Sequence, residues 1–183
     1  MKCTYEICLA AVLVLGCAGS IDSSTPQATV KVQHTKEHGI STTTIKLDPI
    51  PIQSDQVKNA YILLIASVVY FDKSPKRKYV SLSFHSSSAN CRFSNKANLV
   101  LILDDETITL SSKQRNGNGG LWVFSELEGD VCNESCAVFI SEQTFLRLTK
   151  SQNVDARLGE LRLQLGEHHL KALRELAGYL VTG

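Results

Sequence analysis

Runs of apolar residues, some continuous and some alternating with polar ones, fill the middle of the chain and predict β-strands. Residues 61–71 (YILLIASVVYF) are apolar on both sides of the alternation, which is typical of a central strand, and a helix beginning at Ser54 is the alternative. Residues 79–84 alternate large apolar side chains with serines, as a half-buried strand does. Further strands are expected at 42–47, 99–103, 107–110, 121–127, 137–140 and 161–165.

The segments between these runs are short and rich in turn residues. Asp104-Asp105 separates two predicted strands, and 116–120 (NGNGG) favours a turn with positive φ. Because short turns join antiparallel neighbours, we expect an antiparallel sheet. The pattern over 30–51 is weak, and the two proline steps at 48–51 end the strand predicted at 42–47.

The period of the pattern changes in the last third of the chain. Ser141 is a typical N-cap and predicts a short helix behind it. Gly166 ends the last predicted strand, and 168–181 then places leucines on one face and charged residues outside it, which predicts an amphipathic helix. Such a helix most simply covers a sheet. The expected fold class is therefore α+β: an antiparallel β-sheet with a short helix and an amphipathic C-terminal helix packed on one face.

The first twenty residues follow a different pattern. A short polar start precedes the apolar run 7–16, and small residues follow that run, an order typical of an export signal. A helix that spans a bilayer needs roughly 20 apolar residues, so this run is too short to be a transmembrane anchor.

Residues 14–17 (VLGC) resemble the lipobox of bacterial lipoproteins, in which aliphatic and small residues precede an obligatory cysteine. Leu15 is less usual there than a small residue, and Glu6 weakens the charged start. The resemblance implies cleavage before Cys17 and a diacylglycerol on its sulfur, so Cys17 would be the lipidation site and the lipid would hold the protein at a membrane. Ala18, where an aspartate would retain the protein at the inner membrane, implies the outer membrane facing the periplasm.

Ordinary secretion is the alternative, because 18–20 (AGS) also fits a signal-peptidase site and Cys17 would then leave with the signal. With lipidation, we expect a signal peptide at 1–16, a lipidated cysteine and flexible tether at 17–29, and a single α+β domain at 30–183. The tether prediction rests on the small, polar, proline-containing composition of its residues.

Charge gives no indication of a nucleic-acid partner. Cleavage before Cys17 removes Lys2 and Glu6 and leaves 18 basic and 17 acidic side chains. Such a balance provides no field that attracts nucleic acid. The remaining 167 residues are enough to bury a core, and we predict neither a metal nor a cofactor.

Cys3 and Cys8 would leave with the signal and Cys17 would carry the lipid, which leaves Cys91, Cys132 and Cys136. An exported protein meets an oxidising compartment, where thiols can pair. Three thiols cannot all pair within one chain. Cys132 could pair with Cys136, or either could bridge to Cys91, and the sequence does not choose. The C-x3-C spacing is not that of a redox dithiol, and without a nearby histidine it falls short of a zinc site.

Four basic residues, Lys73, Lys76, Arg77 and Lys78, lie between two predicted strands. We interpret them as a solvated turn that discourages pairing at a sheet edge. The alternative is contact with anionic headgroups, lipopolysaccharide or an acidic partner.

The histidines show no metal-binding spacing. His34 and His38 lack the helical stripe of a zincin, and the adjacent side chains of His168 and His169 would point about 100° apart at the start of a helix. We expect all four to be surface residues without a metal.

His85, three serines behind it, and Asp104, Asp105 and Glu126 supply the residue types of a hydrolytic site. The strained G-x-S-x-G elbow is absent, and a triad is defined by geometry that spacing does not reveal. We therefore predict no catalytic residue.

A second resemblance is to an uncharacterised module of exported bacterial proteins. It rests on the succession of LVLILDDETITL, Glu126 at a strand end, VFISEQTFLRL, RLGELRLQL and HHLKALRELAGYL. It covers about 68–180 and carries over no catalytic position.

Two functional hypotheses follow. In the first, a lipid-anchored bacterial envelope protein binds another envelope protein without catalysis. In the second, an envelope enzyme or small-ligand carrier uses His85, Asp104, Asp105 or Glu126. A pocket joining those side chains would favour the second hypothesis, and a shallow surface with exposed apolar groups the first.

Overall fold

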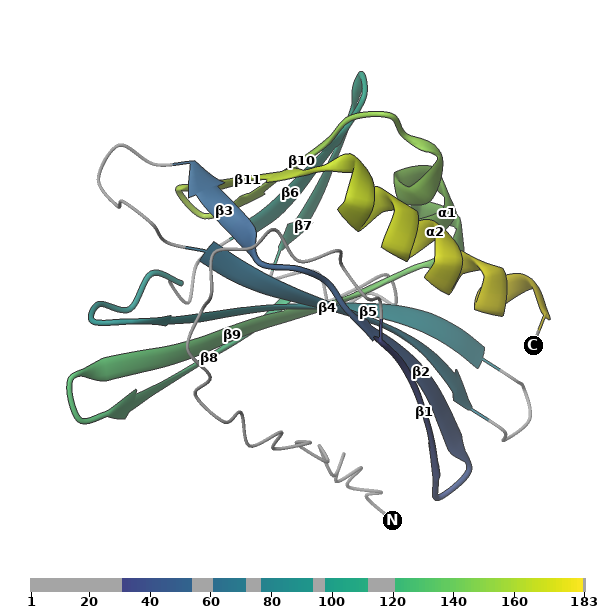
Figure 1. The fold of residues 1–183 in the computed structure, drawn as a ribbon, viewed down its shortest axis with the longest axis horizontal. Helices are drawn as coiled ribbons and strands as arrows, with labels where there is room; N and C mark the ends of the chain where they lie inside the picture. Colours follow the sequence, from purple (N-terminus) through teal and green to yellow (C-terminus); the bar gives the residue numbers. More distant parts are fainter. Residues whose placement is uncertain (1–30, 54–60, 72–76, 94–97, 112–120, 183) are drawn as a thin grey trace, which may run out of the picture.

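A computed structural model describes residues 31–53, 61–71, 77–93, 98–111 and 121–182 (Figure 1). The predicted signal peptide, Cys17, the tether, Lys73, Lys76 and the glycine-rich segment 116–120 lie outside these residues. The strands are β1 (Lys31–Glu37), β2 (Ile40–Lys46), β3 (Ile50–Gln53), β4 (Tyr61–Phe71), β5 (Arg77–Ser88), β6 (Asn98–Leu103), β7 (Glu106–Ser111), β8 (Leu121–Glu128), β9 (Val131–Ile140), β10 (Val154–Leu158) and β11 (Leu161–Leu165). The helices are α1 (Glu142–Lys150) and α2 (Glu167–Thr182).

The strands form a single sheet that dominates the fold. Its order is β7-β6-β10-β11-β3-β4-β5-β9-β8, with β2 also paired to β4 and β1 to β2. Every pair is antiparallel, which confirms the predicted antiparallel sheet. The α+β prediction is confirmed in outline, with a larger share of sheet and a smaller share of helix than the sequence pattern indicates.

β4 is the strand at which the sheet divides into two layers. Along one edge it pairs with β3 at Tyr61 and Ile62, and then with β2 from Ile65 to Phe71. Its other edge pairs with β5. The prediction of a central strand at 61–71 is therefore confirmed, and the alternative helix is wrong for these residues.

We call β1, β2, β4, β5, β9 and β8 the long-strand layer, and β3, β11, β10, β6 and β7 the short-strand layer. Figure 1 shows the two layers diverging from β4, with α1 and α2 on the side where they open. The helices therefore lie against the inner side of the long-strand layer.

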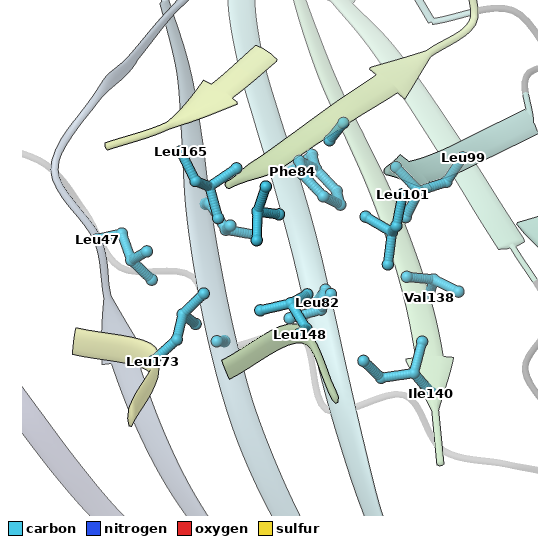
Figure 2. Close-up of a cluster of buried hydrophobic side chains, with 14 of the residues drawn as sticks. Leu47, Leu82, Phe84, Leu99, Leu101, Val138, Ile140, Leu148, Leu165 and Leu173 are labelled. Carbon is cyan, nitrogen blue, oxygen red and sulfur yellow. The ribbon is translucent and has the colours of Figure 1, made fainter. Parts of the chain in front are cut away.

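The core fills the space between the two layers and the helices. Leucines dominate it, and Figure 2 shows side chains from β5, β6, β9, β11, α1 and α2 pointing toward one another. Phe84 and Phe145 are the largest of the fully buried side chains. The labelled members in Figure 2 are Leu47, Leu82, Phe84, Leu99, Leu101, Val138, Ile140, Leu148, Leu165 and Leu173.

Three strands, β1, β3 and β10, are absent from the sequence-based prediction, and β5 and β9 are longer than expected. β2 ends at Lys46, before the proline steps, as predicted, and the unpredicted strand β3 includes Pro51. It needs few ladder bonds, because it pairs with β4 at Ile50 and Pro51 and with β11 at Ile52 and Gln53.

Both predicted helices are present. Ser141 caps α1, because its Oγ accepts a hydrogen bond from the Thr144 backbone N–H at 3.1 Å. α2 buries a leucine stripe in the core, as its amphipathic pattern predicts. Among the described residues, neither helix combines the length and apolar character needed to cross a lipid bilayer.

His169 joins the start of α2 to the chain before it and is 3% exposed. Its Nδ1 accepts a hydrogen bond from the Gly166 backbone N–H at 3.0 Å, so the proton of the neutral ring is on Nε2, which is buried. Burial lowers the pKa of His169, and the charge of His168 lowers it further, while Asp48 opposes the shift. The prediction of a surface residue is wrong for His169.

Replacing a core isoleucine tests the packing between the layers. Ile62→Ala removes a fully buried side chain of β4 and should lower the free energy of unfolding by about 2–5 kcal/mol. Ile40→Ala, at a partly exposed position of β2, should cost less than about 1 kcal/mol. Urea unfolding measures both, and equal costs would contradict the described core.

Acid should destabilise the fold through His169. The folded-state pKa lies below the unfolded value of about 6.5, so the unfolded chain binds more protons and stability falls as pH drops below that value. His169→Gln keeps an acceptor for Gly166 and should reduce the loss of unfolding free energy between pH 7.5 and 5. His38→Gln, at an exposed turn, is the control. An unchanged pH dependence in His169→Gln would contradict the assignment.

Candidate interaction surface

The long-strand layer has one side that faces away from the helices and the core, which we call the outer face. Side chains alternate along each strand, so the residues opposite the buried ones form this face. The register places Ile65 beside Ser83, and Ser83 beside Ala137 and then Trp122. The outer face is thus half apolar and half polar.

An aromatic row crosses the outer face from β4 to β8. Phe71 meets Tyr79 edge to face with ring centres 5.9 Å apart, Tyr79 meets Phe139 at 6.4 Å, and Phe139 meets Trp122 at 5.5 Å. Aromatic pairs of this geometry are worth about 0.5–1.5 kcal/mol each beyond area burial. The row is therefore held in place by its own contacts.

The row ends on β8, the edge strand of the long-strand layer, where two aromatic side chains are exposed. Trp122 is 45% exposed and Phe124, two residues along the same face of β8, is 51% exposed. Apolar groups gathered in this way on a surface are typical of interaction sites.

Beside these aromatic residues lies the turn between β8 and β9, which we call the acidic hairpin. Glu126, Glu128 and Asp130 are exposed there, around Leu127, which is 71% exposed. Gly129 has a φ of 61° at the first position of the two-residue turn, a conformation that favours glycine. The acidic hairpin thus exposes the Leu127 side chain among three negatively charged carboxylates.

Polar groups on the outer face pair with one another. Thr44 Oγ1 and Ser67 Oγ lie 2.9 Å apart. His85 lies between Leu63 and Ser135 in the register. Burial lowers the pKa of His85, and the positive charge of Lys46 lowers it further, so this ring is neutral at neutral pH.

The residues of the hydrolytic hypothesis do not meet at one site. His85 lies on β5 and Glu126 on β8, with β9 between them. Asp104 and Asp105 form the β6–β7 turn, which Figure 1 shows on the other side of the molecule from the acidic hairpin. Asp104 accepts hydrogen bonds from the Gln152 and Asn153 backbone N–H groups, which lower its pKa and anchor the segment after α1.

The structure joins Cys91 to Cys132 by a disulfide and leaves Cys136 as a buried free thiol. The bridge closes a loop with a sequence separation of 41, which the loop-entropy account values at roughly 4 kcal/mol. Burial raises the pKa of Cys136 to about 12, so this thiol stays protonated and unreactive.

Glu134 lies next to the disulfide and fixes the segment after Cys91. Its buried carboxylate accepts hydrogen bonds from the backbone N–H groups of Arg92 and Phe93, the second at 2.7 Å. The sulfurs of Cys91 and Cys132 are near enough to this carboxylate to share an ion, but they are bonded to each other. The group therefore acts as a structural clamp.

The basic residues between β4 and β5 are described only in part. Lys78 lies on the inner side, where its Nζ donates to the Leu180 carbonyl at 2.9 Å and lies 5.4 Å from the centre of the Tyr70 ring. Tyr70 donates to the Tyr179 carbonyl. Lys78 thus holds the end of α2, and the prediction of a solvated side chain is wrong for it. Of Arg77, only the backbone is described.

The other predicted histidine sites also stay apart. His34 lies on β1, with its Nδ1 3.0 Å from Thr43 Oγ1 and its ring against Tyr179, whereas His38 lies in the following turn. His168 Nε2 lies 4.0 Å from Asp48 Oδ2. None of these contacts assembles a set of metal ligands.

Sequence reasoning missed the outer face, because Trp122 and Phe124 appear as ordinary apolar positions of a strand. The signal that could have separated them is the alternation at 121–124, where Leu121 and Val123 occupy the other side of the strand. Comparison with protein-family models, curated proteins and solved structures gave no match to this chain.

Proposed function

We propose that this chain is a lipid-anchored protein of the bacterial cell envelope that binds another envelope protein through the outer face, without catalysing a reaction. The observation that carries the binding role is the exposure of Trp122 and Phe124 at the end of an ordered aromatic row. Rigid aromatic side chains offer a large contact area at a low cost in conformational entropy, and they dominate binding energy at many interfaces.

The surroundings of the row suggest the chemistry of the partner. Glu126, Glu128 and Asp130 place three negative charges beside the exposed aromatic and aliphatic groups. A surface that combines apolar residues with lysine or arginine would complement both features. The partner we propose is therefore a protein with an apolar, basic patch.

The lipobox resemblance at Cys17 supports the anchoring role. The composition of residues 18–29 predicts a tether between a lipidated Cys17 and β1, and a flexible chain of that length would span roughly 20 Å, enough to keep the domain clear of the lipid headgroups. The outer membrane, facing the periplasm, is the location that Ala18 favours. An anchored domain of this kind would meet its partner by moving within the plane of the membrane.

The alternative of an enzyme or small-ligand carrier has less support. His85 and Glu126 share the outer face but are separated by β9, and Asp104 is engaged by the segment after α1. No observation on the described residues brings a nucleophile, a base and an acid together.

Intact mass tests the anchor. The protein isolated from membranes should begin at Cys17 and carry the mass of attached acyl chains, because thioether-linked lipid is retained through purification. Cys17→Ala should lose the acyl mass and remain unprocessed. An unmodified chain that begins at Ile21 would contradict the proposal.

Photocrosslinking tests the binding surface. A photoreactive phenylalanine analogue at Trp122, in full-length protein in bacterial cells, should give products that join the chain to a different protein, separated by mass from any product of two copies of the chain. The same analogue at Lys171, exposed on α2, should give at least tenfold less product.

The charge of the acidic hairpin provides a second comparison. Combining Glu126→Lys with Glu128→Lys should reduce the Trp122 products severalfold, because it repels a basic partner. Glu160→Lys, at the exposed β10–β11 turn, should not. Equal yields from positions 122 and 171 would rule out the outer face as the binding surface.

A further inference from the structure

β8 is an end strand of the described sheet, and its residues 121–125 carry none of the charged side chains that usually discourage pairing. Among the strands that the structure describes it pairs with β9 alone, residue for residue over its eight positions, so it has no bulge. It contains no proline, lysine or arginine. Proteins generally use such residues, bulges or short strands to keep an edge from pairing with another chain.

The other end strands differ from β8. β1 carries Lys31 and Lys36 along its seven residues. β7 has six residues and begins with Glu106, whose carboxylate is ion-paired with Arg147 of α1. β8 therefore combines length, a regular edge and exposed apolar side chains in a way that the other two strands do not.

Phe124 lies at the centre of the segment 121–127 of β8, which has a leucine at each end. Trp122 and Glu126 lie two residues on either side of it on the outer face, and Leu121 and Leu127 lie three residues on either side of it on the opposite face. We propose that two copies of this chain pair antiparallel along β8, with Phe124 of each copy facing Phe124 of the other at the twofold axis.

This register buries the exposed groups against one another. Phe124 meets its own copy, and Leu127, the most exposed apolar side chain of the strand, meets Leu121 of the second copy. Trp122 lies beside Glu126 of the second copy. Cross-strand neighbours of this kind are the unit that stabilises a sheet.

The charges also favour this register over those centred nearer the acidic hairpin. Glu126 of one copy lies four residues from Glu126 of the other, about 14 Å along the strand, which exceeds the screening length of about 8 Å at physiological ionic strength. A register centred on Glu126 would place the two carboxylates opposite each other. One centred on Ser125 would place Phe124 and Trp122 opposite glutamates.

Pairing in this way would continue the long-strand layer from one copy into the next. The outer faces of the two copies would join, and their aromatic rows would meet at the axis. An isologous edge contact closes on itself and gives a dimer rather than a filament. The inference does not depend on the proposed partner, because it concerns the edge of β8 and a second copy of the same chain.

Opposite charges at position 124 test the twofold axis. Full-length chains with two different C-terminal tags are co-expressed and extracted in detergent, and co-purification measures association. The unsubstituted pair should co-purify. Phe124→Lys paired with itself, and Phe124→Glu paired with itself, should each associate at least tenfold less, because like charges face each other at the axis. Phe124→Lys paired with Phe124→Glu should recover association to within twofold of the unsubstituted pair.

The recovery separates an effect on the interface from an effect on folding, since a misfolded chain would not regain association with an oppositely charged one. Tyr61→Lys, at an aromatic position of matching exposure on β4, should leave association unchanged. Failure of the unsubstituted chains to co-purify, or equal association in all pairs, would overturn the proposal. Loss without recovery would overturn the Phe124 register.

Cysteine crosslinking gives an independent readout of register in intact cells. Phe124→Cys should form a disulfide-linked dimer, because residues at the axis lie directly opposite each other. Glu126→Cys should not, because it faces Trp122 of the second copy. Efficient crosslinking at position 126 and none at position 124 would contradict the proposed register and indicate one centred on Glu126.

Discussion

The architecture depends on the division of one edge of β4 between two strands. β2 leaves that edge after Lys46, the Leu47 backbone N–H still donates to the Leu64 carbonyl at 2.9 Å, and β3 takes over at Ile62 and Tyr61. Pro49, which has no backbone N–H to contribute to a ladder, lies in the gap. β3 pairs on its other edge with β11. The whole short-strand layer therefore turns away from β1 and β2, and the space between the two layers holds the core.

The same division determines which surface is left open. The short-strand layer and both helices lie on the inner side of β4, β5 and β9, so the outer face has no helix of the described chain against it. Its aromatic row is ordered by edge-to-face contacts, and Thr44 and Ser67 form a hydrogen bond on it. Side-chain groups that would otherwise be free to rotate are thus fixed before any partner arrives, which lowers the entropy lost on binding.

The sequence predicts the strands whose apolar pattern is strong, such as β4 and β6, and both helices, because burial on one or both sides imposes a clear period. β1 is missed because its residues are mainly polar, although His38-Gly39, both with positive φ, is a hairpin turn that could have indicated it. β10 is also missed, although Val154, Ala156 and Leu158 alternate with charged residues. The candidate surface is harder to predict, since register alone decides whether Trp122 faces the core or the solvent.

The C-terminal helix has a consequence for when the domain can fold. α2 follows all eleven described strands in the chain, yet Leu170, Leu173 and Leu176 lie in the middle of the core. Until those leucines have been synthesised, the apolar side chains between the two layers remain partly exposed, and the strands lack part of the core that stabilises them. A nascent chain of this design would therefore complete its core only after α2 has been synthesised, so the domain would fold after its strands have left the ribosome rather than one strand at a time.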